Sequence, residues 1–412
     1  MRVILLSTYD LGRQPFGLAS PAAWLKRAGF AVTCLDLSRE KLSPDVIIGA
    51  GFAACYLPMH TATRLALPVI ARIRAINPSI TIAAYGLYAP LNETLLREHG
   101  VSVVLGPESE AELVAWVTGN PEGLPPPTLP KLAFIQPDRT GLPALSRYAS
   151  LQMPDGSRKV VGATDATRGC KHRCRHCPIV PVYDGQFRVV PMEVVMADVR
   201  ALAASGATHI TFGDPDFFNG PTHARKLVEA LHREFPSLTY DVIIKVEHLL
   251  QHRELLAVLV QTGCLFVTSA VESVDDEVLA KLEKGHTRAD FLAAAALCRA
   301  EGLTLVPTFV TFTPWTTLDG FRDLQEVVEA AGLTAHVSPI QWGIRLLVTW
   351  QSRLLELEDI QKVIGPFDQK TLTFPWRHPD PRVDELQQHM MEQASAPRPR
   401  TEVPYLNEPW YC

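Results

Sequence analysis

The stretch Thr167-Arg-Gly-Cys170-Lys-His-Arg-Cys174-Arg-His-Cys177-Pro178 decides the fold of this 412-residue chain. Its three cysteines have the spacing C-x3-C-x2-C and directly follow an expected strand at 160–166. Three thiolates can hold three irons of a 4Fe–4S cubane and leave the fourth iron without a protein ligand. A zinc site is the alternative, because His172 or His176 is available as a fourth ligand. A chance cysteine cluster is a second alternative, but the position at a strand end favours iron and sulfur.

Outward from this stretch, residues 158–350 alternate strand-like and helix-like patterns. Strands are expected at 160–166, 209–213, 240–245, 265–271, 304–309 and 335–340. Helices are expected at 191–205, 221–235, 248–262, 275–284, 289–301 and 318–331. Six strand–helix units predict a partial (β/α)6 barrel, with its working face at the carboxyl ends of the strands.

The same alternation fills residues 1–118, with strands expected at 3–6, 31–35, 46–49, 80–84 and 101–105. Helices are expected at 19–28, 61–76, 91–99 and 109–117. Five strands with helices between them predict a flavodoxin-like doubly wound domain. Residues 119–157 are rich in proline and predict a linker with little regular structure. Residues 351–412 form a short C-terminal extension with one helix expected at 382–393, so the fold class is α/β.

The composition of the chain limits the classes of partner that we expect. The net charge of −5 offers no basic field for nucleic acid. No apolar run approaches 18 residues and no signal peptide is visible, so we expect no membrane partner and a cytoplasmic address. The scattered Cys34, Cys55, Cys264 and Cys298 are expected to be buried thiols. The basic run Arg168, Lys171, Arg173 and Arg175 is expected to offset a negative cluster or to lie in solvent.

The cysteine triplet resembles that of the radical S-adenosylmethionine (SAM) superfamily, over roughly residues 158–350. The resemblance implies a 4Fe–4S cluster on Cys170, Cys174 and Cys177, with SAM bound at the open iron. It also implies a small-molecule substrate and a one-electron reductant of the flavodoxin or ferredoxin type. One departure is His176, because the residue before the third cysteine is usually aromatic in that family.

SAM-binding candidates lie around the triplet and at the expected strand ends: His176, Gly213, Asp214, Asp216, Lys245, Glu272, Ser273 and Arg345. Gly213 and Asp214 occupy the place that contacts the SAM amino group in the family. Glu272 and Ser273 resemble its Glu-Ser strand end. The alternatives are structural: an aspartate cap on the helix at Pro221, a Ser273 cap on the next helix, and a surface salt bridge for Arg345.

A doubly wound domain ahead of such a barrel resembles the cobalamin-binding radical SAM class. Cobalamin candidates by this resemblance are Ser7, Thr8, Gln14, Met59, His60, Tyr85, Gly86, Tyr88 and Gly106. The D-x-H-x-x-G signature that supplies a cobalt ligand is absent, so bound cobalamin would lack that histidine. The alternative is a vestigial domain without a corrin.

The C-terminal segments around Trp342–Leu355, Trp376–Gln387 and Asn407–Cys412 resemble the CUAEP/CCAEP-tail radical SAM proteins, relatives of the arsinothricin-pathway enzyme. In that group a second cysteine or a selenocysteine follows the position of Cys412, which is therefore a candidate thiol. We expect that a selenocysteine codon was read as a stop or that the tail was lost.

Three functions follow as hypotheses. The first is methylation or alkylation of a small molecule by a SAM-cleaving transferase, assisted by cobalamin. The second is transfer of the 3-amino-3-carboxypropyl group from SAM to a soft acceptor such as arsenite. The third is a non-enzymatic metal-binding or corrin-binding protein.

Overall fold

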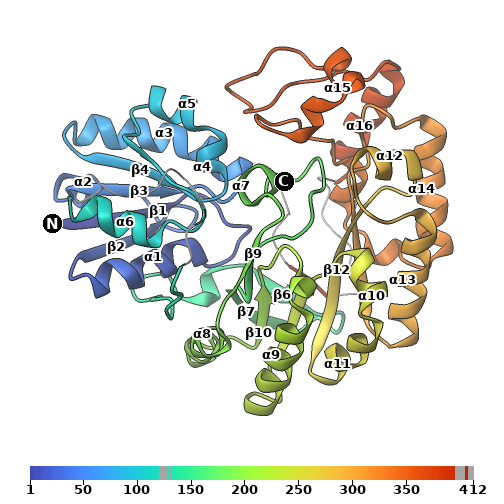
Figure 1. The fold of residues 1–412 in the computed structure, drawn as a ribbon, viewed down its shortest axis with the longest axis horizontal. Helices are drawn as coiled ribbons and strands as arrows, with labels where there is room; N and C mark the ends of the chain where they lie inside the picture. Colours follow the sequence, from blue (N-terminus) through green and yellow to red (C-terminus); the bar gives the residue numbers. More distant parts are fainter. Residues whose placement is uncertain (120–128, 130–131, 395–403, 407–412) are drawn as a thin grey trace.

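A computed structural model describes residues 1–119, 129, 132–394 and 404–406 of the chain. Figure 1 shows two α/β domains side by side, each built on one sheet and called a layer below. The N-terminal layer is blue, and the second layer runs from green to orange. A C-terminal extension, in red, lies above the second layer. This arrangement confirms the expected fold class.

The N-terminal sheet is wholly parallel and has the order β2-β1-β3-β4-β5. Its strands are β1 (Arg2–Ser7), β2 (Ala31–Asp36), β3 (Phe52–Tyr56), β4 (Thr81–Tyr85) and β5 (Val103–Val104). The helices are α1 (Phe16–Arg27), α2 (Pro44–Ile48), α3 (His60–Ile76), α4 (Tyr88–Leu91), α5 (Glu93–Glu98) and α6 (Glu110–Val117). Val3 packs with Leu18 of α1 on one face, whereas Ile4 packs with Ile70 of α3 on the other. Alternate residues of β1 therefore face helices on both sides, as in a flavodoxin-like domain.

The expected strand at 46–49 is wrong. Those residues belong to the short helix α2, and the third strand is β3. Pro44 stands at the first position of α2, where its missing N–H costs nothing and its fixed φ favours a helix. The strand β3 carries alanines and a cysteine in place of β-branched residues, so its sequence gives little strand signal.

The second sheet has the order β13-β12-β11-β10-β7-β6-β14 and curls into a half-barrel. The parallel strands are β7 (Arg158–Thr164), β10 (His209–Phe212), β11 (Thr239–Ile243), β12 (Cys264–Glu272) and β13 (Thr304–Phe309). The helices are α8 (Met192–Ala204), α9 (Pro221–Glu234), α10 (Val246–Gln251), α11 (Leu256–Gln261), α12 (Asp276–Lys281), α13 (Arg288–Ala300) and α14 (Leu318–Ala330). The antiparallel strands β6 (Ser150–Gln152) and β14 (Tyr405–Leu406) extend one edge.

The sixth barrel strand expected at 335–340 is wrong. This segment forms two 3-10 turns, η4 (Thr334–His336) and η5 (Pro339–Gly343). Pro339 has no N–H for a strand ladder, and the Gln341 side chain accepts the Phe309 N–H at the edge of β13 (2.8 Å). A single parallel bridge between Phe312 and Arg345 stands in the place of the sixth strand.

The expected linker is not wholly irregular, because it contains η1 (Leu145–Arg147) and the strand β6. Residues 120–128 and 130–131 of it lie outside the described part of the chain. The extension contains η6 (Arg353–Glu356), α15 (Glu358–Val363) and α16 (Pro381–Ala394), and α16 confirms the helix expected at 382–393. Within the described residues, no helix combines the length and the apolarity needed to cross a bilayer.

Buried charges join the two layers. Arg168 donates to the Glu110 carboxylate at the start of α6 (2.7 Å) and to Ser20 of α1 (3.2 Å). Arg139, from the connecting segment, pairs with Asp198 of α8 (2.8 Å) and donates to Gln14 (2.9 Å). These contacts set the N-terminal sheet against the carboxyl end of the half-barrel.

Candidate functional site

The three cysteines lie on a loop at the tip of a small hairpin, between β8 (Thr167–Gly169) and β9 (Phe187–Val189). The hairpin follows β7, so the loop stands at the carboxyl end of the parallel strands, where we expected it. Cys170 and Cys174 are buried, Cys177 is partly buried, and all three are free thiols. The short helix α7 (Val180–Tyr183) closes the loop.

The entrance of the loop has a fixed shape. Gly169 has φ of +77°, and a Cβ there would lie 2.4 Å from the Tyr183 ring and 2.6 Å from the Gln186 carbonyl oxygen. The buried Asn219 of η2 (Phe217–Asn219) donates to the Gly169 carbonyl (3.3 Å) and accepts the Lys171 N–H (3.2 Å). A glycine is therefore required immediately before Cys170.

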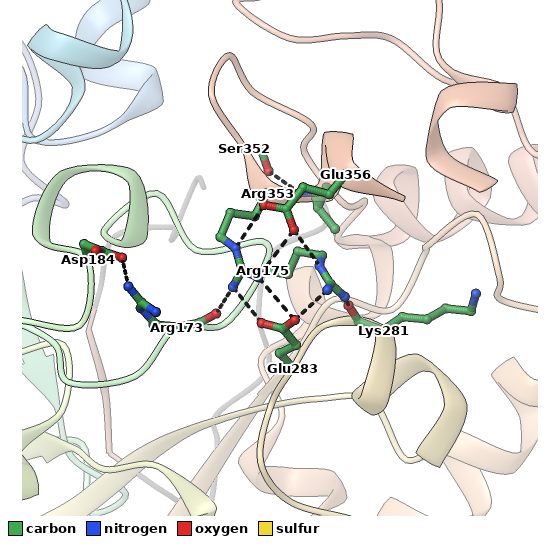
Figure 2. A network of polar contacts seen from close by, with 9 residues as sticks. Arg173, Arg175, Asp184, Lys281, Glu283, Ser352, Arg353 and Glu356 are labelled. Atoms are coloured by element: carbon green, nitrogen blue, oxygen red, sulfur yellow. Dashed lines mark hydrogen bonds and ion pairs between the residues drawn. The ribbon is translucent and has the colours of Figure 1, made fainter. Parts of the chain in front are cut away.

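The middle of the loop is clamped to the extension (Figure 2). Arg353 of η6 donates to the Arg173 carbonyl (2.8 Å) and to the Glu283 carboxylate (2.6 Å). Arg175 donates from its backbone to Leu282 (2.9 Å) and from its side chain to Glu283 (2.5 Å). These contacts hold the residues on both sides of Cys174.

The arginines of the basic run pair with carboxylates rather than with the thiols, and Lys171 and Arg173 are exposed, as the solvent alternative expected. Arg168 pairs with Glu110, Arg173 with Asp184, and Arg175 with Glu283. A buried cation lies near Cys174 and Cys177: it is Lys284, which is 3% exposed. Burial alone would lower the pKa of Lys284. Glu272, Cys174 and Cys177 together raise that pKa by more than burial lowers it, so the net shift is upward.

The thiols themselves are poor acids in the described protein. Burial raises the pKa of Cys170 to about 11 and that of Cys177 to about 12. Both groups are therefore protonated near neutral pH, and binding of a metal centre through thiolates must release protons.

Two SAM-binding candidates from distant segments meet beside the loop. Nε2 of His176 lies 3.2 Å from Oε1 of Glu272, and Nζ of Lys284 lies 3.3 Å from the same oxygen. Burial alone would raise the pKa of Glu272, but the charge of Lys284 and the contact with His176 hold it down at about 2. Glu272 also has φ of +69°, a conformation that is costly for a non-glycine residue and is typical of functional sites. Lys284 was not among the candidates from the sequence, although the run Lys284-Gly285-His286, one helix after the Glu272 strand end, was a usable signal.

Other candidates take structural roles in this arrangement. The buried Asp214 accepts hydrogen bonds from the Ala166 N–H (2.9 Å) and the Thr167 hydroxyl (2.5 Å), so it orients β8. A Cβ at Gly213 would lie 2.6 Å from the Asp165 carboxylate. Ser273 accepts the Asp275 N–H (3.1 Å), but the cap of α12 is Asp275 itself, so the capping alternative for Ser273 is wrong.

Arg345 lies away from the cysteines. It donates to Asp384 of α16 (2.7 Å) and to the Trp376 carbonyl (2.6 Å), and its guanidinium lies over the Trp376 ring. This is the salt-bridge alternative, and it attaches the extension to the barrel. Lys245 is buried with Nζ 3.5 Å from the Glu247 carboxylate, close enough to Cys170 to lower the pKa of that thiol in part.

A cavity of about 170 Å³ separates the N-terminal sheet from the barrel. Tyr56 and Tyr85 line it from one side, and Asp165 and Gly213 from the other. The Tyr56 ring rests on Gly17, where a Cβ would lie only 2.1 Å from a ring carbon. Of the cobalamin candidates, Tyr85 and Gly86 line this cavity, whereas Ser7, Thr8, Gln14, Met59, His60, Tyr88 and Gly106 do not.

Several of those seven residues have polar partners elsewhere; the Thr8 hydroxyl, for example, donates to the Ala62 carbonyl (2.8 Å). Gln14 donates to the Pro143 carbonyl (2.9 Å), and His60 contacts the Thr371 carbonyl of the extension (2.5 Å). Cobalamin binding by the set remains a prediction.

The family model for the radical SAM superfamily matches residues 165–328, which include the cysteine loop and the strands from β10 to β13. Residues 165–328 form a radical SAM domain. Enzymes with this domain use a 4Fe–4S cluster and SAM, together with a small-molecule substrate and a reductant.

Among curated proteins, the chain is similar to the hopanoid C-3 methylase of Methylococcus capsulatus. The two are 24% identical over 393 residues, covering 86% of this chain and 72% of the methylase. It is also similar to a tRNA-2-methylthio-N(6)-dimethylallyladenosine synthase of Chlorobaculum tepidum, with 25% identity over 64% of this chain and 62% of that enzyme.

Two solved structures share the fold. The radical SAM methyltransferase TsrM of Kitasatospora setae, with cobalamin and a 4Fe–4S cluster bound, has a TM-score of 0.63 at 18% identity. That match covers 80% of this chain and 70% of TsrM. The cobalamin-dependent radical SAM enzyme OxsB has a TM-score of 0.69 at 13% identity, covering 94% of this chain and 66% of OxsB. The narrower resemblance to the CUAEP/CCAEP-tail proteins remains a prediction, and Cys412 lies outside the described residues.

The radical SAM domain fits a cluster, whereas the cavity between the layers does not by itself enclose a corrin. Three free thiols share one clamped loop, with the ammonium of Lys284 beside Cys174 and Cys177 to balance added negative charge. The cavity between the layers is smaller than the roughly 300 Å³ at the low end for small-molecule pockets. A corrin is larger than a drug-sized ligand, so it would extend beyond this cavity, which opens to solvent, or would need the layers or Tyr56 to move.

Replacing Gly169 with alanine is expected to lower cluster incorporation at least several-fold, because the new Cβ collides with Tyr183 and Gln186. Iron and sulfide per chain after anaerobic reconstitution measure this. The matched control is Gly206→Ala, which has a similar φ of +93° but nothing within 4 Å of the added Cβ. Equal iron in the two variants would contradict the assigned role of Gly169.

Replacing Arg353 with alanine is expected to speed removal of the cluster by a chelator. Loss of a partly exposed ion-pair network worth about 1 kcal/mol corresponds to about a fivefold faster rate. The decay of the cluster absorbance under anaerobic chelation measures it. Arg382→Ala, which breaks an exposed pair with Asp380 in the same extension, should leave the rate unchanged.

Proposed function

We propose that this protein is a SAM-cleaving transferase that methylates or alkylates a small molecule, using a 4Fe–4S cluster on Cys170, Cys174 and Cys177. We place it in the cytoplasm, with a one-electron reductant of the flavodoxin or ferredoxin type. The likeness to methylases and methyltransferases in the comparisons supports the class of reaction.

The observation that carries the proposal is the set of three free thiols on one clamped loop inside the radical SAM domain. A cluster held by three thiolates keeps one iron open for SAM, and it supplies the electron that reduces SAM. Zinc would need a histidine beside the thiols. His176 instead contacts Glu272, and His172 approaches Asp216 (3.4 Å).

The chain's own side chains prepare this position. Lys284 offsets the charge of thiolates, and Glu272 stays ionised because its pKa is about 2. An ionised, buried carboxylate at the strand end is suited to accept hydrogen bonds from an ammonium or a ribose hydroxyl of bound SAM. His176 and Lys284 orient that carboxylate.

Cobalamin is the cofactor that the likeness to TsrM and OxsB suggests for the space between the layers. Because the cavity in this arrangement does not by itself enclose a corrin, no residue role above depends on it. Transfer of the aminocarboxypropyl group and simple storage of metal or corrin are not favoured by the comparisons.

The experiment is anaerobic reconstitution with iron and sulfide, followed by SAM and a reductant, with nucleosides identified by mass spectrometry. We expect S-adenosylhomocysteine or 5′-deoxyadenosine from the intact chain and at least a hundredfold less from Cys174→Ala. Cys298→Ala, which removes a buried thiol of α13, is the matched control and should keep full activity.

Two outcomes would overturn the proposal. Equal turnover of SAM by Cys174→Ala would show that the cluster takes no part in the reaction. Methylthioadenosine as the product would show cleavage on the aminocarboxypropyl side, and a soft acceptor such as arsenite would then replace methyl transfer.

Cobalamin is tested separately, by adding hydroxocobalamin before gel filtration. Retention of about one corrin per chain, with increased S-adenosylhomocysteine, would show that the layers open to admit it. Full SAM turnover without retained corrin would assign the reaction to the cluster alone.

A further inference from the structure

Three side chains outside the cysteine set converge beside the loop. His172 comes from the loop itself, Asp216 from the segment after β10, and His248 from α10. Nε2 of His172 lies 3.4 Å from Oδ2 of Asp216, and Nδ1 of His248 lies 2.6 Å from the same oxygen. One donor atom from each residue lies within 4.8 Å of the other two.

These atoms are buried without hydrogen bonds among the described residues. The side chains of Asp216 and His248 are 0% and 1% exposed. Oδ2 of Asp216, both ring nitrogens of His248 and Nε2 of His172 have no hydrogen-bond partner beyond the histidine–aspartate contacts given above. Burying such groups unsatisfied is costly.

The local structure holds this arrangement in place. Oδ1 of Asp216 accepts the Phe218 N–H (3.1 Å) at the start of η2, which leaves Oδ2 facing the two imidazoles. His248 sits in the first turns of α10, and its ring lies 4.6 Å from the ring of His172. The donors therefore come from three separately anchored segments.

Two histidines and one carboxylate form a donor set that first-row divalent ions bind with coordination positions left open. A tetrahedral ion with bonds of about 2.1 Å places its donors about 3.4 Å apart, so the three atoms need shifts of only about 1 Å. Nδ1 of His172 lies 3.6 Å from the Glu247 carboxylate, a usual second partner for a metal-bound imidazole. Lys245 is the nearby opposing charge, and it lies 3.5 Å from the same carboxylate.

We propose that His172, Asp216 and His248 bind a divalent first-row transition ion, in a mononuclear site distinct from the three cysteines. The site stands beside the cysteine loop at the carboxyl ends of β10 and β11, so its open positions face the working side of the barrel. The proposal does not depend on which group the enzyme transfers from SAM.

Zinc binding to the full-length, cluster-loaded chain tests this. After anaerobic reconstitution, Zn²⁺ is added and the excess is removed by gel filtration. Zinc, iron and sulfide are counted per chain. We expect about one zinc beyond the cluster iron, with nitrogen and oxygen neighbours at about 2.0–2.1 Å by zinc X-ray absorption, whereas thiolate binding would give sulfur at about 2.3 Å.

Asp216→Asn and His248→Gln should each weaken zinc retention about tenfold or more, with cluster iron unchanged. His252→Gln is the matched control: its ring lies 5.7 Å from that of His248, but it is not one of the three donors. If one variant fails to take up a cluster, the other variant and the absorption spectrum of the unmodified chain decide whether these three residues bind zinc.

The proposal is overturned if the unmodified chain retains no zinc, if sulfur surrounds the zinc, or if both variants retain it fully. SAM cleavage is measured separately, so its presence or absence does not bear on these results.

Discussion

A loop without regular structure carries the three thiols, and the site depends on how firmly that loop is held. The surrounding elements hold it through polar contacts rather than through strand pairing of its own. Asn219 forms hydrogen bonds with the residues on both sides of Cys170, and Arg353 donates a hydrogen bond to the backbone just before Cys174. Each such hydrogen bond contributes only about 1 kcal/mol. The loop is therefore defined by several weak restraints from η2, α12 and the C-terminal extension acting together.

The arginines and the lysines around this loop have different partners. The arginines within and before it pair with carboxylates: Arg168 with Glu110 of α6, Arg173 with Asp184 after α7, and Arg175 with Glu283 after α12. Two lysines are buried here, Lys245 after β11 and Lys284 after α12, and Lys284 lies near Glu272 and two of the thiols. A lysine ammonium is a compact positive charge that offsets nearby negative charge. An arginine guanidinium instead donates its hydrogen bonds in a fixed fork geometry. The strained φ of Glu272 fits the same logic, because it aims an ionised carboxylate into this charged space.

The sequence predicted the features that depend on local pattern. The cysteine spacing, the parallel sheets and the helix at 382–393 could all be read from it. It failed where a few residues override the pattern. Pro44 turned a β-branched run into a helix, and Pro339 with Gln341 replaced the sixth strand. The set of His172, Asp216 and His248 could not be recognised as one group from sequence, because 32 or more residues separate its members and only the barrel's curvature brings them together.

The position of the N-terminal domain is coupled to the cysteine loop through one residue. Arg168 stands two positions before Cys170, and its buried guanidinium pairs with Glu110 of the N-terminal domain. Breaking a buried pair leaves an uncompensated charge at a cost of about 3–5 kcal/mol. Any ligand large enough to separate the layers must offset part of this cost or keep the pair intact. Opening of the interdomain cavity would therefore pull on the strand that leads into Cys170, and occupancy of that cavity and the geometry of the thiols cannot vary independently.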